Sequence, residues 1–252
     1  MYKLKYKIRD DGTYSATGVI GIASLIKRLD IPAVHKGKPV TEVSGELLSK
    51  LTSLEELILP HCIKKIDIEE LRNNKSLRRI EAAQDFSTEK SVDPELPFII
   101  LIDEVLYSNY GKALAKYPAA RPANEFVIPR GVASIGEGAF WNCQNLTSIA
   151  IPDSVTSIGA WAFYSCDSLT SVTVPDSVMT IGHSAFKSCL ELETVYYAGT
   201  VDQWENIIFE TDNYGFHGNS DLNSATRYYY SESEPTEVGN FWHYVDGVPT
   251  KW

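Results

Sequence analysis

The chain lacks several features that would point to a particular class of protein. Its 23 Lys and Arg residues are outnumbered by 33 Asp and Glu residues, which gives a formal net charge of -10 over 252 residues. Binding to nucleic acid needs a cationic surface that displaces counterions from phosphates, so we expect no nucleic-acid partner. No apolar run reaches about 18 residues, and we therefore expect no insertion into a membrane.

Side chains that carry chemistry are also sparse. The four cysteines form no CxxC pair, and none of the five histidines stands in a recognisable context for a serine or cysteine nucleophile. Zinc sites need such ligand spacings, and nucleophilic catalysis needs an adjacent base. We therefore expect no metal site, no cofactor, no catalytic residue and no enzymatic activity.

A fixed period of 23 residues is the most informative feature that is present. Six residue types recur in register over three units, and the recurring positions are Pro129, Pro152, Pro175; Ile135, Ile158, Ile181; Gly136, Gly159, Gly182; Phe140, Phe163, Phe186; Cys143, Cys166, Cys189; and Leu146, Leu169, Leu192. A period of this length is typical of a solenoid, in which each unit covers the apolar flank of the next.

The alternation within one unit predicts a short strand whose copies pair in a parallel sheet. Val172 and Val174 are expected to point inward, with Ser171 and the exposed Thr173 outward. Gly159 is expected to supply a tight bend through a positive φ. We expect a short helical or 3₁₀ turn to follow it, in which Phe163 stacks on the Phe rings one period away.

The three repeated cysteines are expected to be buried free thiols, because side chains in adjacent coils stand farther apart than a disulfide prefers. The same skeleton continues upstream with weaker letters, since Pro60 is followed by Ile66, Leu71, Leu77 and Ile80 at the corresponding places. Between Ile80 and Pro129 the register breaks, and two apolar runs around the stretch NYGK predict a hairpin insertion near residues 99–117.

Units such as IPDSVTSIGAWAFYSCDSLTSVTV resemble the BspA-type leucine-rich repeats of bacterial surface proteins, from about Tyr14 to Tyr197. The resemblance implies a repeat solenoid: a leucine-rich-repeat right-handed coil with a parallel β-sheet and short 3₁₀ or helical turns, capped at both ends. We expect an N-terminal strand pair over residues 1–31, repeat coils over 32–197, and a C-terminal cap with an aromatic hairpin tail over 198–252.

The resemblance also implies a function. Such domains are non-enzymatic recognition or adhesion modules, so we expect a monomer that is secreted or held at a cell surface and that binds a protein partner, such as a host or matrix protein. The first residues, MYKLKYKIRDDG, lack the apolar segment of a signal peptide. Because the family is usually exported, we expect that a natural signal was removed and Met1 added.

Two surfaces are candidates for that binding. The outward face of the predicted strands carries Glu56, Ile58, Arg79, Glu81, Ser148, Ser171, Thr173, Thr194 and Tyr196. The alternative is a glycan-binding platform in the C-terminal aromatic cluster, with Tyr229, Trp242, Tyr244 and Trp252. We favour the interpretation in which those rings pack as a lid on the last coil, and a structural scaffold without a ligand is the third possibility. Asp246 and Gly247 predict a final hairpin, and Thr200 predicts the start of a capping helix.

Overall fold

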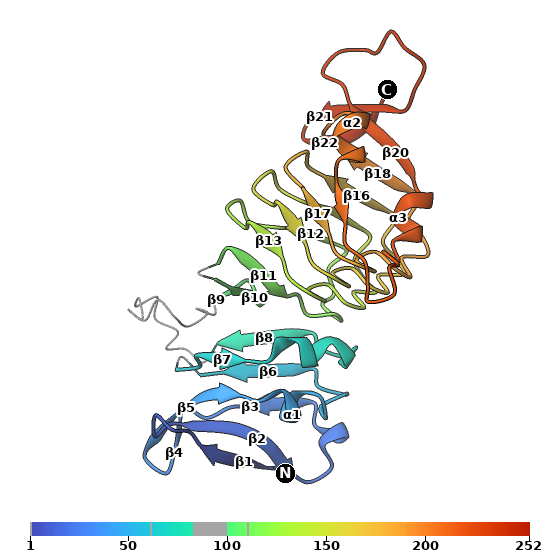
Figure 1. Ribbon diagram of the computed structural model, residues 1–252. Helices are drawn as coiled ribbons and strands as arrows, with labels where there is room; N and C mark the ends of the chain where they lie inside the picture. Colours follow the sequence, from blue (N-terminus) through green and yellow to red (C-terminus); the bar gives the residue numbers. More distant parts are fainter. Residues whose placement is uncertain (1, 61, 83–99, 110) are drawn as a thin grey trace. The chain divides into compact units, whose positions relative to one another are not determined.

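The computed structural model describes residues 2–60, 62–82, 100–109 and 111–252 (Figure 1). They divide into two compact units, Met1–Arg121 and Pro122–Trp252, and each is described by itself below. Residues 99 and 110 of the expected hairpin insertion lie outside the described residues. The three-part division into 1–31, 32–197 and 198–252 stays a prediction.

The first unit contains two sheets and a hairpin meander. The strands of its larger sheet are β1 (Lys3–Ile8), β2 (Tyr14–Ile20), β5 (Lys38–Val43), β4 (Val34–His35) and β7 (Lys65–Ile66). The smaller, parallel sheet contains β3 (Arg28–Asp30), β6 (Glu56–Leu59) and β8 (Arg79–Ala82). The antiparallel meander is β9 (Ile100–Ile102), β10 (Val105–Ser108) and β11 (Ala113–Lys116). Short helices complete the coils: α1 (Gly45–Leu48) and the 3₁₀ helices η1 (Ala23–Leu25) and η2 (Ile68–Asn73).

The core of the first unit is a strip of aliphatic side chains from the divergent repeats. The positions predicted to point inward are buried: Ile66 is 7% exposed, and Leu71, Leu77 and Ile80 are 0% exposed. β1 and β2 pair antiparallel as the first strand pair was expected to do. The divergent repeats upstream of the perfect ones therefore fold into the same kind of coil.

The second unit contains the perfect repeats. One sheet contains β12 (Glu125–Val127), β14 (Ser148–Ala150), β16 (Ser171–Val174), β18 (Thr194–Tyr197), β20 (Thr226–Tyr230), β21 (Phe241–Val245) and β22 (Val248–Lys251). Shorter parallel strands run along the other side: β13 (Ser134–Ile135), β15 (Ser157–Ile158), β17 (Thr180–Ile181) and β19 (Ile208–Phe209). Two helices, α2 (Val201–Glu205) and α3 (Ser220–Ser224), lie near the C-terminal end.

Identical side chains stack along the interior of the second unit. Phe163 is 0% exposed and lies between Phe140 and Phe186, with ring centroids 4.9 and 4.8 Å apart and planes tilted by only 7° and 15°. The turn segment that carries each Phe also bonds to the next coil, because Phe140 N–H donates to Ala162 O and Phe163 N–H to Ala185 O, both at 2.7 Å. This ladder fixes the spacing of the coils.

The sequence predicted that Gly159 is needed for a positive φ, and this reason is wrong. Its φ is not positive; the residues with positive φ in this turn are Trp161 and Ser165, at 54° each. Gly159 is needed because the backbone of the previous coil passes close by, so that a Cβ there would lie 2.7 Å from Glu137 N and 2.9 Å from the carbonyl carbon of Gly136. The repeated glycine serves close approach between coils rather than a bend.

The last coil is closed by residues that imitate a further coil. Phe186 N–H donates to Asn219 Oδ1 at 2.9 Å, and Ser188 N–H donates to Asp221 Oδ2 at 2.8 Å. In the earlier coils the corresponding amides donate to backbone carbonyls. Two side-chain oxygens therefore satisfy donors that an open end would leave unpaired.

Helix α2 and the final hairpin complete the C-terminal end as predicted. Thr200 and Gln203 form a reciprocal capping box at the start of α2, and Trp204 from this helix is 5% exposed against Tyr197, with ring centroids 5.1 Å apart. β21 and β22 pair antiparallel across Asp246 and Gly247, which have φ values of 51° and 80°. Positive φ at both residues suits a two-residue hairpin turn.

Candidate recognition surface

The strands of the second unit present two outward rows in strict register. One row contains Ser148, Ser171, Thr194 and Thr226, and the other contains Ala150, Thr173, Tyr196 and Tyr228. The inward neighbours Val172, Val195 and Tyr197 are all 0% exposed, which fixes the direction of each row. The side chains of the first row are small, and so are those of Ala150 and Thr173 in the second row, as the repeat predicted.

Two of these outward residues are less accessible than the sequence suggested. Thr173 was expected to be exposed, and Thr194 was placed on the same open face, yet their exposed fractions are 7% and 9%. Both lie on central strands, where partners about 4.8 Å away on either side leave a short side chain little open area. Neither Thr can therefore be a principal contact for a partner.

The outward face ends in a cluster of rings at its C-terminal side. We call it the aromatic patch and define it as Tyr196, Tyr228, Tyr230, Trp242 and Tyr244. The Trp242 centroid lies 5.5 Å from that of Tyr196, 5.2 Å from Tyr230 and 4.8 Å from Tyr244. Tyr230 on β20 lies in register with Trp242 on β21. The final hairpin therefore extends the repeat sheet, and its Trp242 and Tyr244 lie on the same face as Tyr196, Tyr228 and Tyr230.

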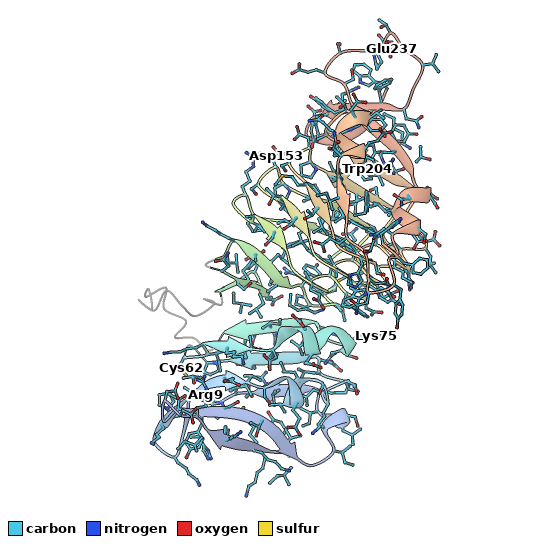
Figure 2. The ribbon with its side chains drawn as sticks, viewed as in Figure 1. Arg9, Cys62, Lys75, Asp153, Trp204 and Glu237 are labelled. Atoms are coloured by element: carbon cyan, nitrogen blue, oxygen red, sulfur yellow. The ribbon has the colours of Figure 1, made fainter. Side chains whose placement is uncertain are left out.

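Trp242 is the buried centre of this patch. It is 0% exposed, and its Nε1–H donates to the Tyr197 carbonyl oxygen at 2.8 Å. Around it, Tyr230 is 38% and Tyr244 50% exposed, and Lys251 Nζ lies 4.5 Å from the centroid of the Tyr228 ring. Burial, with Asp153 and Tyr230 as further causes, raises the pKa of Tyr244. Asp153 stands at the loop edge of this unit (Figure 2).

The four residues of the alternative glycan platform do not come together on one face. Trp242 is wholly buried, and Tyr229 lies on the inward side, with its ring centroid 6.3 Å from that of Tyr197. Trp252 packs against His243 on the opposite face of the final hairpin, with ring centroids 3.8 Å apart, and its Nε1–H donates a hydrogen bond to Ser231 O. Only Tyr244 of that set is an exposed member of the aromatic patch. The lid interpretation is therefore correct for Trp242.

Within the aromatic tail, the sequence analysis did not single out Tyr228, Tyr230 or Lys251. Alternation could have found the two tyrosines, because they follow Thr226 at a spacing of two and share the outward side with it. Lys251 could not be placed without the pairing of β21 with β22, in which it lies opposite Trp242.

The charged candidates lie in the first unit, where they are paired with one another. Arg79 contacts Glu56 and Glu81 at 3.0 Å each, and a residue that the sequence did not single out, Arg28, reaches Glu56 at 3.0 Å. Ile58 is half-buried and lies in register with Asp30 on one neighbouring strand and Glu81 on the other. Such partly exposed pairs are worth about 0–1 kcal/mol each. A charged partner would have to replace contacts that the strand face already makes within itself.

The cysteine ladder is structural. Cys143, Cys166 and Cys189 are buried free thiols, as predicted. Cys166 Sγ donates to Phe140 O at 3.0 Å and Cys189 Sγ to Phe163 O at 3.1 Å. Burial raises the pKa of the Cys189 thiol to about 12 and that of Cys166 well above its ordinary value. Among the described residues, no group of three or more His, Cys, Asp or Glu side chains is placed to hold a metal ion.

Comparison with known proteins agrees with this architecture. Residues 119–231 match the family of BspA-type leucine-rich repeat regions in six copies. This part of the chain is a BspA-type leucine-rich repeat region of the bacterial kind, as the sequence resemblance indicated. No curated protein matches the chain. Within the ranges that the structure describes, none of the helices has the length and apolar character needed to cross a membrane.

Solved structures share the fold. A leucine-rich repeat protein from Eubacterium ventriosum is 21% identical, with a TM-score of 0.61 over 81% of this chain and 48% of its own. The pneumococcal vaccine antigen PcpA is 15% identical, with a TM-score of 0.54 over 82% of this chain and 63% of its own. A leucine-rich cell surface protein from Faecalibacterium prausnitzii is 22% identical over 70% of this chain and 58% of its own, with a TM-score of 0.37. The chain thus spans about half the length of the first of these proteins.

Proposed function

We propose that this chain is a non-enzymatic recognition module, displayed by a bacterium, that binds a protein of its host or of the host matrix through the aromatic patch. The observation that carries the proposal is the exposure of Tyr230 and Tyr244 around the buried Trp242. Tyrosine side chains over a well-packed centre are the usual hot spots of protein interfaces, because they bring large contact area at low entropic cost. The BspA-type repeats support display at a surface, as their resemblance to bacterial surface proteins implies.

The geometry favours a protein over a glycan. A sugar ring stacks on an open, flat aromatic face, whereas the rings around Trp242 meet it edge to face, and the exposed Tyr230 and Tyr244 rings are tilted by 50° to each other. Trp242 makes interplanar angles of 61° with Tyr196, 69° with Tyr230 and 76° with Tyr244. The slots between tilted rings suit protruding side chains, and Lys251 adds a cation that can pair with a partner's carboxylate.

The test is binding of the chain to a panel of purified extracellular-matrix proteins, with and without Tyr230→Ala and Tyr244→Ala combined. Loss of two hot-spot residues should weaken binding at least about thirtyfold. Tyr214→Ala is the matched control, because Tyr214 is 86% exposed but does not belong to the patch. Two other variants would not test binding cleanly. Trp242→Ala removes a core residue, and a charge reversal at Arg79 breaks its ion pairs with Glu56 and Glu81.

Unchanged affinity in the double variant would refute the role of the patch. A glycan array provides the competing outcome, because glycan binding that depends on Tyr244 would favour the alternative module. A chain that folds normally and binds neither class would behave as a scaffold.

A further inference from the structure

A polar cleft of about 590 Å³ lies on the larger sheet of the first unit, away from the charged pairs of β6 and β8. Lys7, Ser15 and Glu42 form one row across its floor, because β1, β2 and β5 hold them in register. Ala16 points the other way, into the core, at 0% exposure. The row therefore occupies the face that this sheet does not use for packing.

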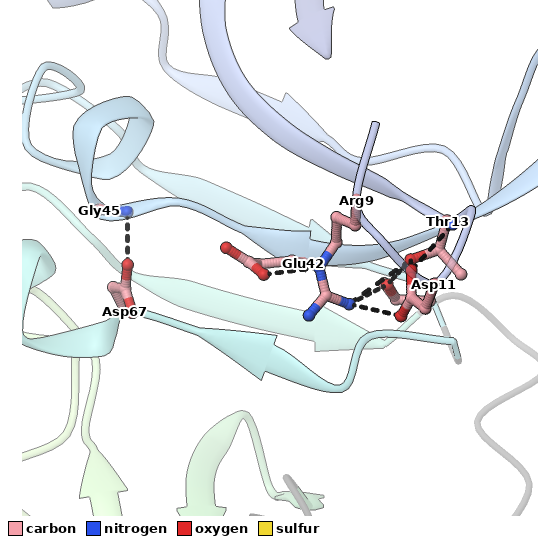
Figure 3. A network of polar contacts seen from close by, with 7 residues as sticks. Arg9, Asp11, Thr13, Glu42, Gly45 and Asp67 are labelled. Atoms are coloured by element: carbon pink, nitrogen blue, oxygen red, sulfur yellow. Dashed lines mark hydrogen bonds and ion pairs between the residues drawn. The ribbon is translucent and has the colours of Figure 1, made fainter. Parts of the chain in front are cut away.

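One wall of the cleft is held in a fixed geometry by Arg9 (Figure 3). Its Nε lies 3.0 Å from Glu42 Oε2 and its Nη1 3.1 Å from Asp11 Oδ2, and Nη1 also donates to Thr41 Oγ1 at 3.1 Å. Asp11 in turn accepts from the backbone and the hydroxyl of Thr13. Glu42 is thus oriented before any ligand arrives, with its Oε2 committed to Arg9 and its second oxygen directed elsewhere.

Two hydroxyls in the cleft lining are buried without a hydrogen-bond partner among the described residues. They belong to Ser15, which is 4% exposed, and to Ser44. Ser44 is notable because it stands at the N-cap of α1, where a serine normally accepts a backbone N–H. Here Asp67 Oδ2 accepts the Gly45 N–H at 2.9 Å instead, and Ser44 Oγ makes no capping bond. Buried hydroxyls without partners are costly, so their presence needs a reason.

The charges around the cleft nearly balance. The cations are Lys7 and Arg9 in the lining, with Lys5 and Lys50 near Glu46 and Lys64 near Asp11, and the anions are Asp10, Asp11, Glu42 and Glu46; Lys50 is paired to Glu46 at 2.7 Å. A phosphate or sulfate would meet the four carboxylates, and an ammonium would meet Lys7 and Arg9. A neutral ligand meets neither repulsion, and the mixture of donors and acceptors suits groups that both donate and accept hydrogen bonds.

We propose that this cleft binds a neutral, polyhydroxylated ligand, a saccharide unit, through the hydroxyls of Ser15 and Ser44 with Lys7 and Glu42 completing the contacts. A sugar hydroxyl can accept from Lys7 and donate to Glu42, and it can satisfy each serine in either direction. This site is independent of the protein-binding surface proposed for the second unit. It gives the chain a second kind of recognition.

The experiment is a titration of the ¹⁵N-labelled full chain with neutral monosaccharides and their disaccharides, followed by NMR up to the solubility limit of each sugar. We expect saturable shifts at Lys7, Ser15 and Ser44. Ser15→Ala and Ser44→Ala should each weaken that binding about three- to tenfold, the effect of one lost hydrogen bond. Ser24→Ala is the matched control, since Ser24 is exposed on the same unit outside the cleft. Combined replacement of Tyr230 and Tyr244 should leave the shifts unchanged.

A second measurement separates a binding role from a structural one. Because neither hydroxyl has a partner within the protein, Ser15→Ala and Ser44→Ala should melt at the wild-type temperature or above it in the absence of sugar. Lower melting temperatures would show that the hydroxyls bond within the fold and would overturn the proposal. So would the absence of a saturable shift with every sugar, or sugar affinities that both variants retain.

Discussion

Replacing Phe163 with alanine tests the stacked interior most directly. The ring is 0% exposed and lies between two others at 4.9 and 4.8 Å, so its removal deletes two stacked contacts as well as the buried area. The hydrogen bonds from Phe140 N–H and Phe163 N–H to the next coil hold the coil spacing, and the cavity therefore cannot collapse. Core Phe→Ala changes cost about 3–5 kcal/mol, and two lost stacks of about 0.5–1.5 kcal/mol place this one near 4–5 kcal/mol.

The assay is urea unfolding followed by tryptophan fluorescence. This probe reports the second unit alone, because the five tryptophans of the chain are Trp141, Trp161, Trp204, Trp242 and Trp252. Phe216→Ala is the control of the same residue type, because Phe216 is 70% exposed and should change stability by no more than about 0.5 kcal/mol. A cost below about 1 kcal/mol for Phe163→Ala, or one equal to that of the control, would refute the stacked interior.

Two further predictions use the same unfolding assay. Gly159→Ala should cost about 1–3 kcal/mol, because its Cβ would lie 2.7 Å from Glu137 N, and a wild-type midpoint would contradict the close approach of the coils. Burial raises the pKa of Cys189 from 9.0 to about 12, so the stability that its protonated thiol contributes is complete below pH 9.0 and is lost as the pH rises toward 12. Cys189→Ala should therefore lose less stability than the wild type over that interval, and an equally steep decline in both would contradict the assignment.

The stacked interior was predictable because a fixed period constrains the fold directly. If Phe140, Phe163 and Phe186 occupy equivalent places in successive coils, their rings must lie over one another whatever the details of the turns. The same reasoning placed the three cysteines correctly. It could not say why Gly159 is glycine, because a positive φ and a close backbone approach select the same residue.

The proposed recognition surface was predicted only in part, because most of the residues of the aromatic patch lie beyond the periodic segment. Tyr196 belongs to the last regular strand and could be assigned an outward direction from its neighbours. Trp242 comes from a tail without repeats, and its burial depends on the pairing of Tyr230 with Trp242, which no period encodes. Ser15 lies in the N-terminal strand pair and Ser44 in the first of the divergent coils, where the repeat gives little information about individual side chains.

The way in which the last coil ends has a consequence for the length of such proteins. Asn219 and Asp221 supply the acceptors that another turn of backbone would provide, so growth at that end would require their replacement. Between two of the perfect repeats there is no such obstacle, because each boundary joins the same chemistry on both sides. Whole coils can be gained or lost there by duplication or deletion, while the finished terminus is inherited intact.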